Sequence, residues 1–95
     1  MRIIFLRSSQ RDVEWFREYY MRVFPVGGPK ARDQYQRAKA LLKTSPHAGH
    51  PVEETGVRMF SIPRSPFAFV YRVSGGVIEV LRVWDQRSKP PDKWV

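Results

Sequence analysis

The sequence predicts one α+β domain spanning residues 1–95, in which a two-helix hairpin packs on a mostly antiparallel four-stranded sheet. Apolar residues recur at helical spacing up to about residue 44, whereas short runs rich in β-branched and aromatic residues begin at residue 57. The 95 residues, 42% of them hydrophobic, can fill one modest core. The expected order of elements is strand, helix, helix, strand, strand, strand.

A short strand and a first helix are expected at the start of the chain. Residues 3–6 are apolar and lie between charged residues, which predicts the strand. Ser8 and Ser9 supply a hydroxyl suited to an N-cap, and the carboxylate of Asp12 complements the positive end of the helix dipole. Apolar side chains then recur at helical spacing until Pro25, so the helix is predicted over about residues 9–24.

A second helix should pack against the first. Gly27 and Gly28 form a short turn, and the next apolar stripe predicts a helix over about residues 29–44, stopped by Pro46. Because the turn is so short, the two helices should form an antiparallel hairpin. The helical arginines are expected on its solvated face: Arg11, Arg17, Arg22, Arg32 and Arg37.

Three further strands are predicted in the second half, over residues 57–62, 67–73 and 77–84. Gly75 and Gly76 separate the last two strands. This pair is typical of a type I′ hairpin turn, because such a turn needs positive φ at both central residues.

The register of this hairpin decides which face of the sheet each side chain joins. With a two-residue turn, Arg72 lies opposite Glu79 as a favourable cross-strand ion pair. That register places seven residues on one face: Phe67, Phe69, Tyr71, Ile78, Val80, Arg82 and Trp84. A three-residue turn would exchange the faces of the last strand. In either register the face away from the helices is partly apolar and basic, which is typical of a binding surface.

Charge and residue types exclude several classes of function. With 17 Lys and Arg against 9 Asp and Glu, the net charge is +8, which favours a polyanionic or acidic partner. There is no cysteine, which excludes disulfides, cysteine–zinc sites and thiol catalysis. His47 and His50 are interpreted as loop histidines, so neither a metal nor a cofactor is expected. No apolar run has the length of a membrane span or a secretory signal, so a cytoplasmic protein is expected.

Glu53 and Glu54 are candidates for the general base of an RNA-cleaving site. Such a site also needs a cationic clamp for the phosphate and an acid for the leaving oxygen. Arginines for the clamp are plentiful, but no His or Tyr follows the last strand to act as the acid. The favoured interpretation of the two glutamates is therefore a pair of solvated turn charges.

Two segments carry a family resemblance: residues 61–73, SIPRSPFAFVYRV, and residues 78–87, IEVLRVWDQR. Together with the order of elements, they resemble the RelE/ParE toxins of bacterial type II toxin–antitoxin systems. The resemblance covers nearly the whole chain. It implies a RelE/ParE-like fold and a toxin that inhibits growth unless its antitoxin is bound.

Members of this family have one of two activities. RelE-like proteins are ribosome-dependent mRNA endonucleases that use basic residues and a C-terminal Tyr or His, whereas ParE-like proteins inhibit DNA gyrase. Arg58 and Arg87 match basic positions of the nucleases, and Glu53 would complete the catalytic set of such an enzyme. Phe60 and Ala68 stand where further basic residues occur, and the C-terminal Tyr or His is missing.

The resemblance therefore favours gyrase inhibition, with the mRNA nuclease as the alternative. A second alternative is a basic nucleic-acid-binding module without toxic activity. The resemblance also implies an acidic antitoxin as partner, in a complex that can hold two copies of each protein. The residues predicted to form the groove that binds the antitoxin or the target are Arg58, Arg64, Arg72, Arg82, Trp84 and Arg87.

Overall fold

A computed structural model describes residues 1–52 and 55–94, which form two long helices and a five-stranded sheet. The elements are β1 (Arg2–Phe5), α1 (Gln10–Glu18), α2 (Gly28–Thr44), β2 (His50–Val52), β3 (Val57–Ser61), β4 (Phe67–Ser74) and β5 (Val77–Asp85). The strands are ordered β1-β5-β4-β3-β2, with β1 parallel to β5 and the other pairs antiparallel. The predicted α+β class is confirmed.

The prediction of four strands is wrong by one. The additional strand, β2, contains only three residues and pairs with the start of β3. It includes Pro51, which is compatible with an edge strand but typical of a loop in sequence. His50, interpreted as a loop histidine, belongs to this strand and is exposed.

The first helix is shorter than predicted, and it lacks the expected side-chain cap. α1 ends at Glu18 and continues into a wider π-helical turn over Tyr19–Val23. Ser9 stands at the predicted N-cap position, but its side chain does not cap the helix. Its buried hydroxyl donates to the carbonyl of Leu6, 2.7 Å away, and makes no capping hydrogen bond to α1.

The turn between β4 and β5 confirms the two-residue prediction. Gly75 and Gly76 have φ values of 58° and 75°, a region that side chains larger than glycine rarely adopt. Arg72 lies opposite Glu79, and its Nε is 2.8 Å from Oε1 of the glutamate. Up to this point the predicted register holds.

A β-bulge then changes the faces of β5. Tyr71 pairs with Val80, but the preceding residue, Val70, pairs with Arg82, so Leu81 is an additional residue in β5. An additional residue reverses the alternation of side chains beyond it. The predicted placement of Arg82 and Trp84 on the face of Phe67 and Tyr71 is therefore wrong.

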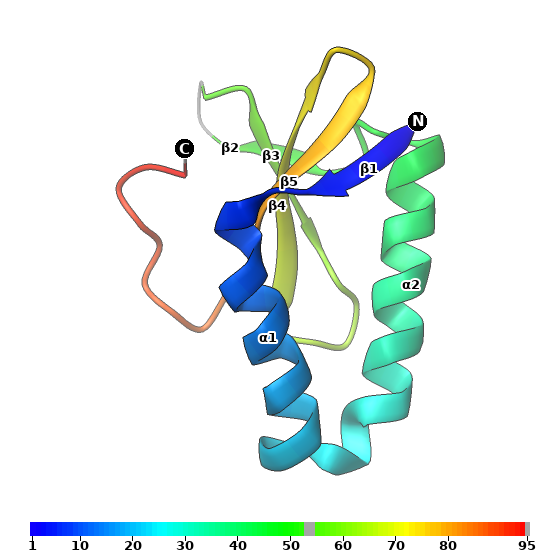
Figure 1. The fold of residues 1–95 in the computed structure, drawn as a ribbon, viewed down its shortest axis with the longest axis vertical. Coiled ribbons are helices and arrows are strands. Elements are labelled where there is room, and N and C mark those ends of the chain that lie inside the picture. The colour runs from blue at the N-terminus through cyan, green and yellow to red at the C-terminus, as the bar shows by residue number, and fades with distance from the viewer. Residues whose placement is uncertain (53–54, 95) are drawn as a thin grey trace.

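The two faces of the sheet have different cores. On one face, Phe67, Phe69 and Tyr71 are fully buried against Phe16 of α1 and Leu42 of α2. The two helices run as a hairpin from the sheet to a turn at the far end of the molecule (Figure 1).

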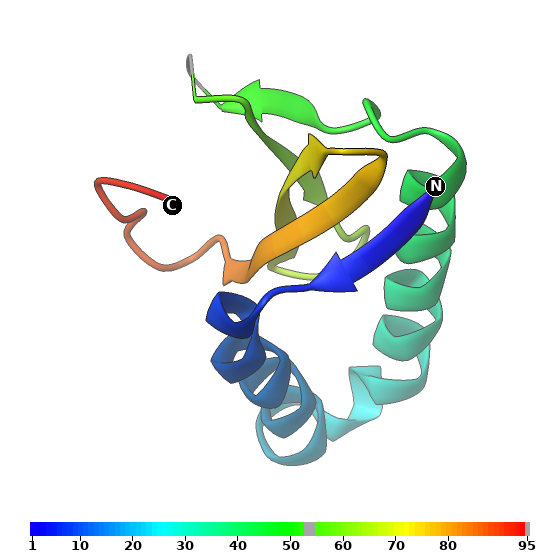
Figure 2. The same cartoon turned by 45° about the horizontal axis from the view of Figure 1, so that its top comes forward.

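The opposite face, called here the outer face, has a smaller core. Val57, Val70 and Leu81 are buried there, beneath Trp84 and the distant Trp94. Residues 86–94 follow β5 on the side of the sheet away from α2 (Figure 2). This segment partly covers the outer face, which the sequence predicted to be open.

Candidate functional site

The outer face brings together three of the predicted groove residues. Arg72, Arg82 and Trp84 all lie on it, because their partners across β4 and β5 face away from the helices. The guanidinium carbon of Arg82 lies 5.1 Å from the ring centroid of Trp84, within reach of a cation–π contact. The edge of Trp94 meets the same ring, with the centroids 5.2 Å apart.

Both arginines on this face are already in ion pairs. Arg72 is paired with Glu79, as described above. Arg82 makes a two-pronged contact with Asp12 of α1, with Nε 2.6 Å and Nη2 3.0 Å from the carboxylate oxygens. These hydrogen bonds raise the pKa of Arg82. The two guanidinium charges are therefore largely balanced within the protein itself.

The contact of Arg82 belongs to a row of polar contacts between α1 and the edge of β5. β1 is shorter than β5, so part of the β5 edge has no strand beside it. Ser8 Oγ donates to the carbonyl of Leu81 (2.7 Å), and the backbone N–H of Val83 donates to Asp12 (3.1 Å). Side chains near the start of α1 thus replace the missing strand, since buried backbone groups need partners.

Arg87 ends this row. Its guanidinium donates to both oxygens of Asp85, at 2.9 and 2.8 Å, and to the hydroxyl of Tyr19 at 3.2 Å. It also lies over the Tyr19 ring, 4.6 Å from the centroid. Trp15 donates to the same carboxylate at 3.3 Å. The hydrogen bonds from Arg87 are the main cause that lowers the pKa of Asp85.

Arg58 and Arg64 lie apart from this cluster. Arg58 lies opposite the buried Tyr71 on the helix side of the sheet, and donates to the carbonyls of Gly49 (2.7 Å) and His47 (3.3 Å). Arg64 is exposed in the turn between β3 and β4, with a left-handed φ of 60°. The six predicted groove residues therefore do not form one continuous groove.

The predicted nuclease residues are also separated. Arg58 lies opposite Tyr71, whereas Asp85, the partner of Arg87, lies opposite Phe67. Tyr71 and Phe67 are four residues apart along β4, a distance of about 13 Å. The candidate bases, residues 53 and 54, lie outside the described residues.

Tyr19 carries a phenol beside Arg87 that the sequence did not predict. The family resemblance implies a tyrosine or histidine after the last strand, whereas here a tyrosine directly after α1 accepts a hydrogen bond from Arg87. The described residues contain no group of three or more His, Cys, Asp or Glu placed to hold a metal ion. In the same part of the chain, no helix has the length and apolarity required to cross a membrane.

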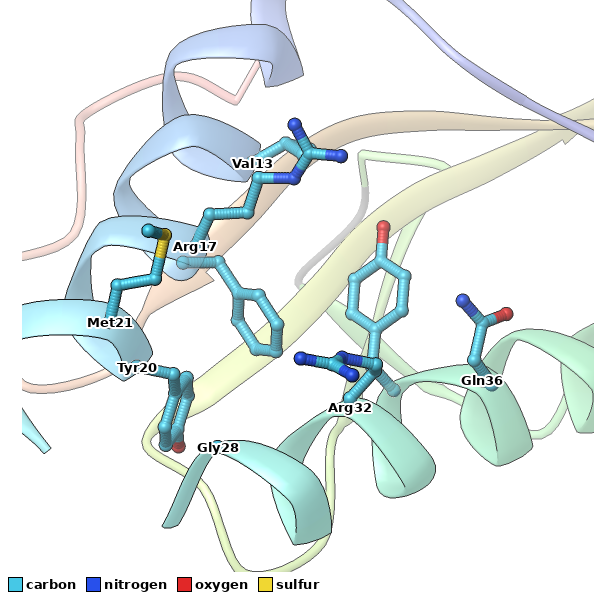
Figure 3. A pocket seen from close by; sticks show the side chains of 9 residues that line it. Val13, Arg17, Tyr20, Met21, Gly28, Arg32 and Gln36 are labelled. Atoms are coloured by element: carbon cyan, nitrogen blue, oxygen red, sulfur yellow. The ribbon is translucent and has the colours of Figure 1, made fainter. Parts of the chain in front are cut away.

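A concave site lies between the helices. This inter-helix groove has a volume of about 470 Å³ and is lined by Val13, Phe16, Arg17, Tyr20, Met21, Gly28, Arg32, Tyr35 and Gln36. Arg17 from α1 and Arg32 from α2 stand on its opposite walls (Figure 3). Neither arginine is in an ion pair with any described residue. The groove therefore combines an apolar, aromatic lining with two unbalanced positive charges.

Arg17 and Arg32 are exposed, as the sequence predicted, but their position on the groove was not predicted. A signal for their position was nevertheless present, because Arg17 follows the buried Phe16 and Arg32 follows the buried Ala31. A residue next to a core position lies about 100° around the helix, at the border of the apolar stripe. Burial raises the pKa of Tyr35, in the groove wall, to about 12.

Comparison with known proteins identifies the family. A family model described as the ParE toxin of type II toxin–antitoxin systems, parDE, matches residues 3–90. The chain belongs to the ParE toxin family. A solved structure of the chromosomal ParDE toxin–antitoxin system from P. aeruginosa is 30% identical, with a TM-score of 0.68. The match covers 87% of this chain and 92% of that one, whereas no curated protein sequence matches.

The family match confirms the predicted resemblance to RelE/ParE toxins. For this ParE-family toxin, the structure offers two surfaces with different properties. The outer face is partly covered by residues 86–94, and its arginines are paired internally. In the inter-helix groove, by contrast, neither Arg17 nor Arg32 forms an ion pair with a described residue. The groove is therefore the better candidate for binding an acidic segment.

Proposed function

We propose that this type II toxin inhibits DNA gyrase and is neutralised by an acidic antitoxin. The observation that carries the gyrase proposal is the pairing of Arg82 with Asp12 and of Arg87 with Asp85. A nuclease needs such cations free to stabilise the charge on a phosphate, and both are directed at carboxylates instead. Membership of the ParE family supports the same choice. A gyrase target implies action in the bacterial cytoplasm.

Cleavage of mRNA on the ribosome is the second candidate. The contact between Tyr19 and Arg87 favours it, because a phenol beside a guanidinium could serve as the missing acid. Against it stands the distance between Arg87 and Arg58, which would have to act on one phosphate. We therefore rank it below gyrase inhibition.

The antitoxin is proposed to bind in the inter-helix groove. An amphipathic acidic segment would bury its apolar side chains against Phe16 and Tyr35 and place carboxylates beside Arg17 and Arg32. The net charge of +8 would accelerate its association. This proposal moves the antitoxin from the predicted sheet face to the helices. A complex with two copies of each protein remains part of the proposal.

Charge reversal tests the location of the antitoxin. We expect Arg17→Glu and Arg32→Glu each to raise the Kd of the antitoxin at least tenfold. A tenfold increase corresponds to a loss of about 1.4 kcal/mol of binding free energy. Arg11→Glu is the matched control, because Arg11 is an exposed arginine of α1 outside the groove. Equal, small effects of all three substitutions would contradict the groove and restore the outer face as the candidate.

Induction in bacteria tests the toxin's activity. We expect growth arrest, loss of negative supercoiling in a reporter plasmid and intact mRNA, all reversed when the antitoxin is produced. Cleaved mRNA with normal supercoiling would favour the nuclease. A third outcome, no growth arrest but salt-dependent binding to DNA, would favour the basic nucleic-acid-binding module.

A further inference from the structure

The turn between the helices forms an exposed apolar tip. Met21, Val23, Phe24 and Val26 are 74, 61, 50 and 86% exposed. These four residues, called here the hairpin tip, lie within six residues of sequence in the turn between α1 and α2. That turn forms one end of the molecule (Figure 1). Exposed apolar residues are ordinary when scattered, but a contiguous group of this kind marks an interaction surface.

The backbone of the hairpin tip is held by hydrogen bonds within the turn. The N–H of Phe24 closes the π-helical turn by donating to the carbonyl of Tyr19 at 2.8 Å, and the N–H of Gly27 donates to the carbonyl of Phe24 at 3.1 Å. The Phe24 ring packs toward Tyr20 and so close to Gly27 that a Cβ there would overlap it. Because the turn is already ordered, binding through its side chains costs little conformational entropy.

Charge around the tip indicates the kind of partner. Between residues 17 and 32 there are four basic residues, Arg17, Arg22, Lys30 and Arg32, and one acidic residue, Glu18. Only Arg22 is paired with that glutamate. Two tips facing each other would repel, which disfavours a second copy of this chain. A partner with acidic groups around an apolar depression is favoured instead.

We propose that the hairpin tip is the surface through which the toxin contacts its target protein, in an apolar pocket rimmed by carboxylates. This inference rests on the proposed function, in which the target is gyrase. A bilayer is the less suitable occupant, because four side chains on one turn provide a small apolar area for membrane anchoring. Inserting Val23 and Val26 into a protein pocket would bury apolar surface that is exposed in the free toxin.

The position of Met21 connects the tip with neutralisation. Its side chain belongs to the tip and also lines the inter-helix groove (Figure 3). An antitoxin segment in the groove would therefore cover one edge of the tip. Target and antitoxin would compete for overlapping surfaces, so neutralisation would require no conformational change in the toxin.

A double substitution, Val23→Asp with Val26→Asp, tests the inference. Both side chains are mostly exposed, so we expect the variant to unfold at the temperature of the unmodified protein. Leu41→Asp is the control, because Leu41 is also an exposed apolar residue, 45% exposed, at the other end of α2. For the double variant, we expect the toxin concentration that half-inhibits gyrase supercoiling to rise at least thirtyfold. This corresponds to the loss of an interface hot spot of about 2 kcal/mol. For the control, we expect that concentration to stay unchanged.

Several outcomes separate this inference from the proposed function. If the unmodified toxin and the double variant inhibit gyrase equally, the tip is not the target surface, although the function stands. If the unmodified toxin leaves gyrase active, growth arrest becomes the readout. Loss of growth arrest in the double variant, but not in the control, would support the hairpin tip as the target surface. Growth arrest by the double variant would overturn the inference. Sedimentation with anionic phosphatidylglycerol vesicles completes the test. Binding abolished by the double substitution without any loss of arrest would assign the tip to a membrane and overturn the inference.

Discussion

Asp12 should stabilise the fold far more than an ordinary helix carboxylate. Its side chain is 15% exposed and accepts three hydrogen bonds, two from Arg82 and one from the backbone N–H of Val83. Asp12→Ala removes all three. It leaves a partly buried guanidinium without its counter-charge and an edge N–H of β5 without its acceptor.

The expected cost follows from these contacts. Removing one partner of a fully buried ion pair costs about 3–5 kcal/mol, whereas an exposed pair contributes about 0–1 kcal/mol. Arg82 remains 30% exposed, so water replaces part of its lost interaction. Adding the unsatisfied N–H of Val83, we expect Asp12→Ala to lower the free energy of unfolding by about 2–3 kcal/mol. For a domain of this size, that lowers the Tm by about 10–20 °C.

Urea and thermal unfolding, followed by circular dichroism, measure this effect. Glu14→Ala is the matched control, because Glu14 is an exposed carboxylate on the same helix. We expect the control to cost less than about 0.5 kcal/mol. A double-mutant cycle with Arg82→Ala should give a coupling of about 1–2 kcal/mol. Equal effects of Asp12→Ala and Glu14→Ala would refute the argument that Asp12 replaces a strand at the edge of β5.

Three further predictions concern stability. Gly49→Ala places a Cβ 2.8 Å from the hydroxyl oxygen of Tyr71, and should lower the free energy of unfolding by about 2–3 kcal/mol in urea titrations. The pKa of Asp85 is lowered mainly by its hydrogen bonds with Arg87, so the stability it contributes is present above its usual pKa of 3.8 and is lost as the pH falls through the lower folded pKa. Asp85→Asn should therefore flatten the acid side of the Tm–pH profile. Burial raises the pKa of Tyr35 to about 12, so its contribution is present below pH 10 and lost as the pH rises from 10 toward 12. Tyr35→Phe should make the alkaline loss of Tm less steep.

Each of these predictions has a contradicting result. A Gly49→Ala variant as stable as the unmodified protein would show that the Tyr71 side chain and the Met59 carbonyl can both move aside at no cost. An unchanged acid limb in Asp85→Asn would mean that the ion pair with Arg87 contributes nothing to folding. Ultraviolet titration in which all tyrosines ionise together near pH 10 would contradict the burial of Tyr35.

The sequence predicted the features that depend on local chemistry. Gly75 and Gly76 specify the hairpin turn because few other residues adopt positive φ, and the pairing of Arg72 with Glu79 follows directly from a two-residue turn. The two helices followed from the apolar stripes. The family followed from the strand segments on either side of the turn, and the ParE match confirms it.

The faces of β5 could not be predicted because both are apolar. A one-residue bulge at Leu81 exchanges Arg82 with Val83, and either placement leaves an apolar residue in each core. The hydrophobic pattern therefore fits a β5 with the bulge as well as one without it, and does not predict the bulge. In the bulged strand, Asp12 accepts hydrogen bonds from both the Arg82 side chain and the backbone N–H of Val83 at the edge of the sheet.

The candidate site escaped prediction for a different reason. Arg17 and Arg32 border the apolar stripes of two helices, and whether they meet depends on the separation of those helices. Aromatic packing sets that separation: the rings of Phe16 and Tyr35 meet between the helices, with centroids 5.0 Å apart. Such a separation arises from tertiary packing, which a pattern along one helix does not contain.

The most direct test of the proposed function uses purified components in parallel. One reaction contains the toxin, DNA gyrase, ATP and relaxed plasmid, and the other contains the toxin with ribosomes programmed with mRNA. We predict inhibited supercoiling or trapped, cleaved plasmid in the first reaction, reversed by the antitoxin, and intact mRNA in the second. Full supercoiling at saturating toxin, together with cleavage of the mRNA on the ribosome, would contradict gyrase inhibition and identify the chain as a nuclease.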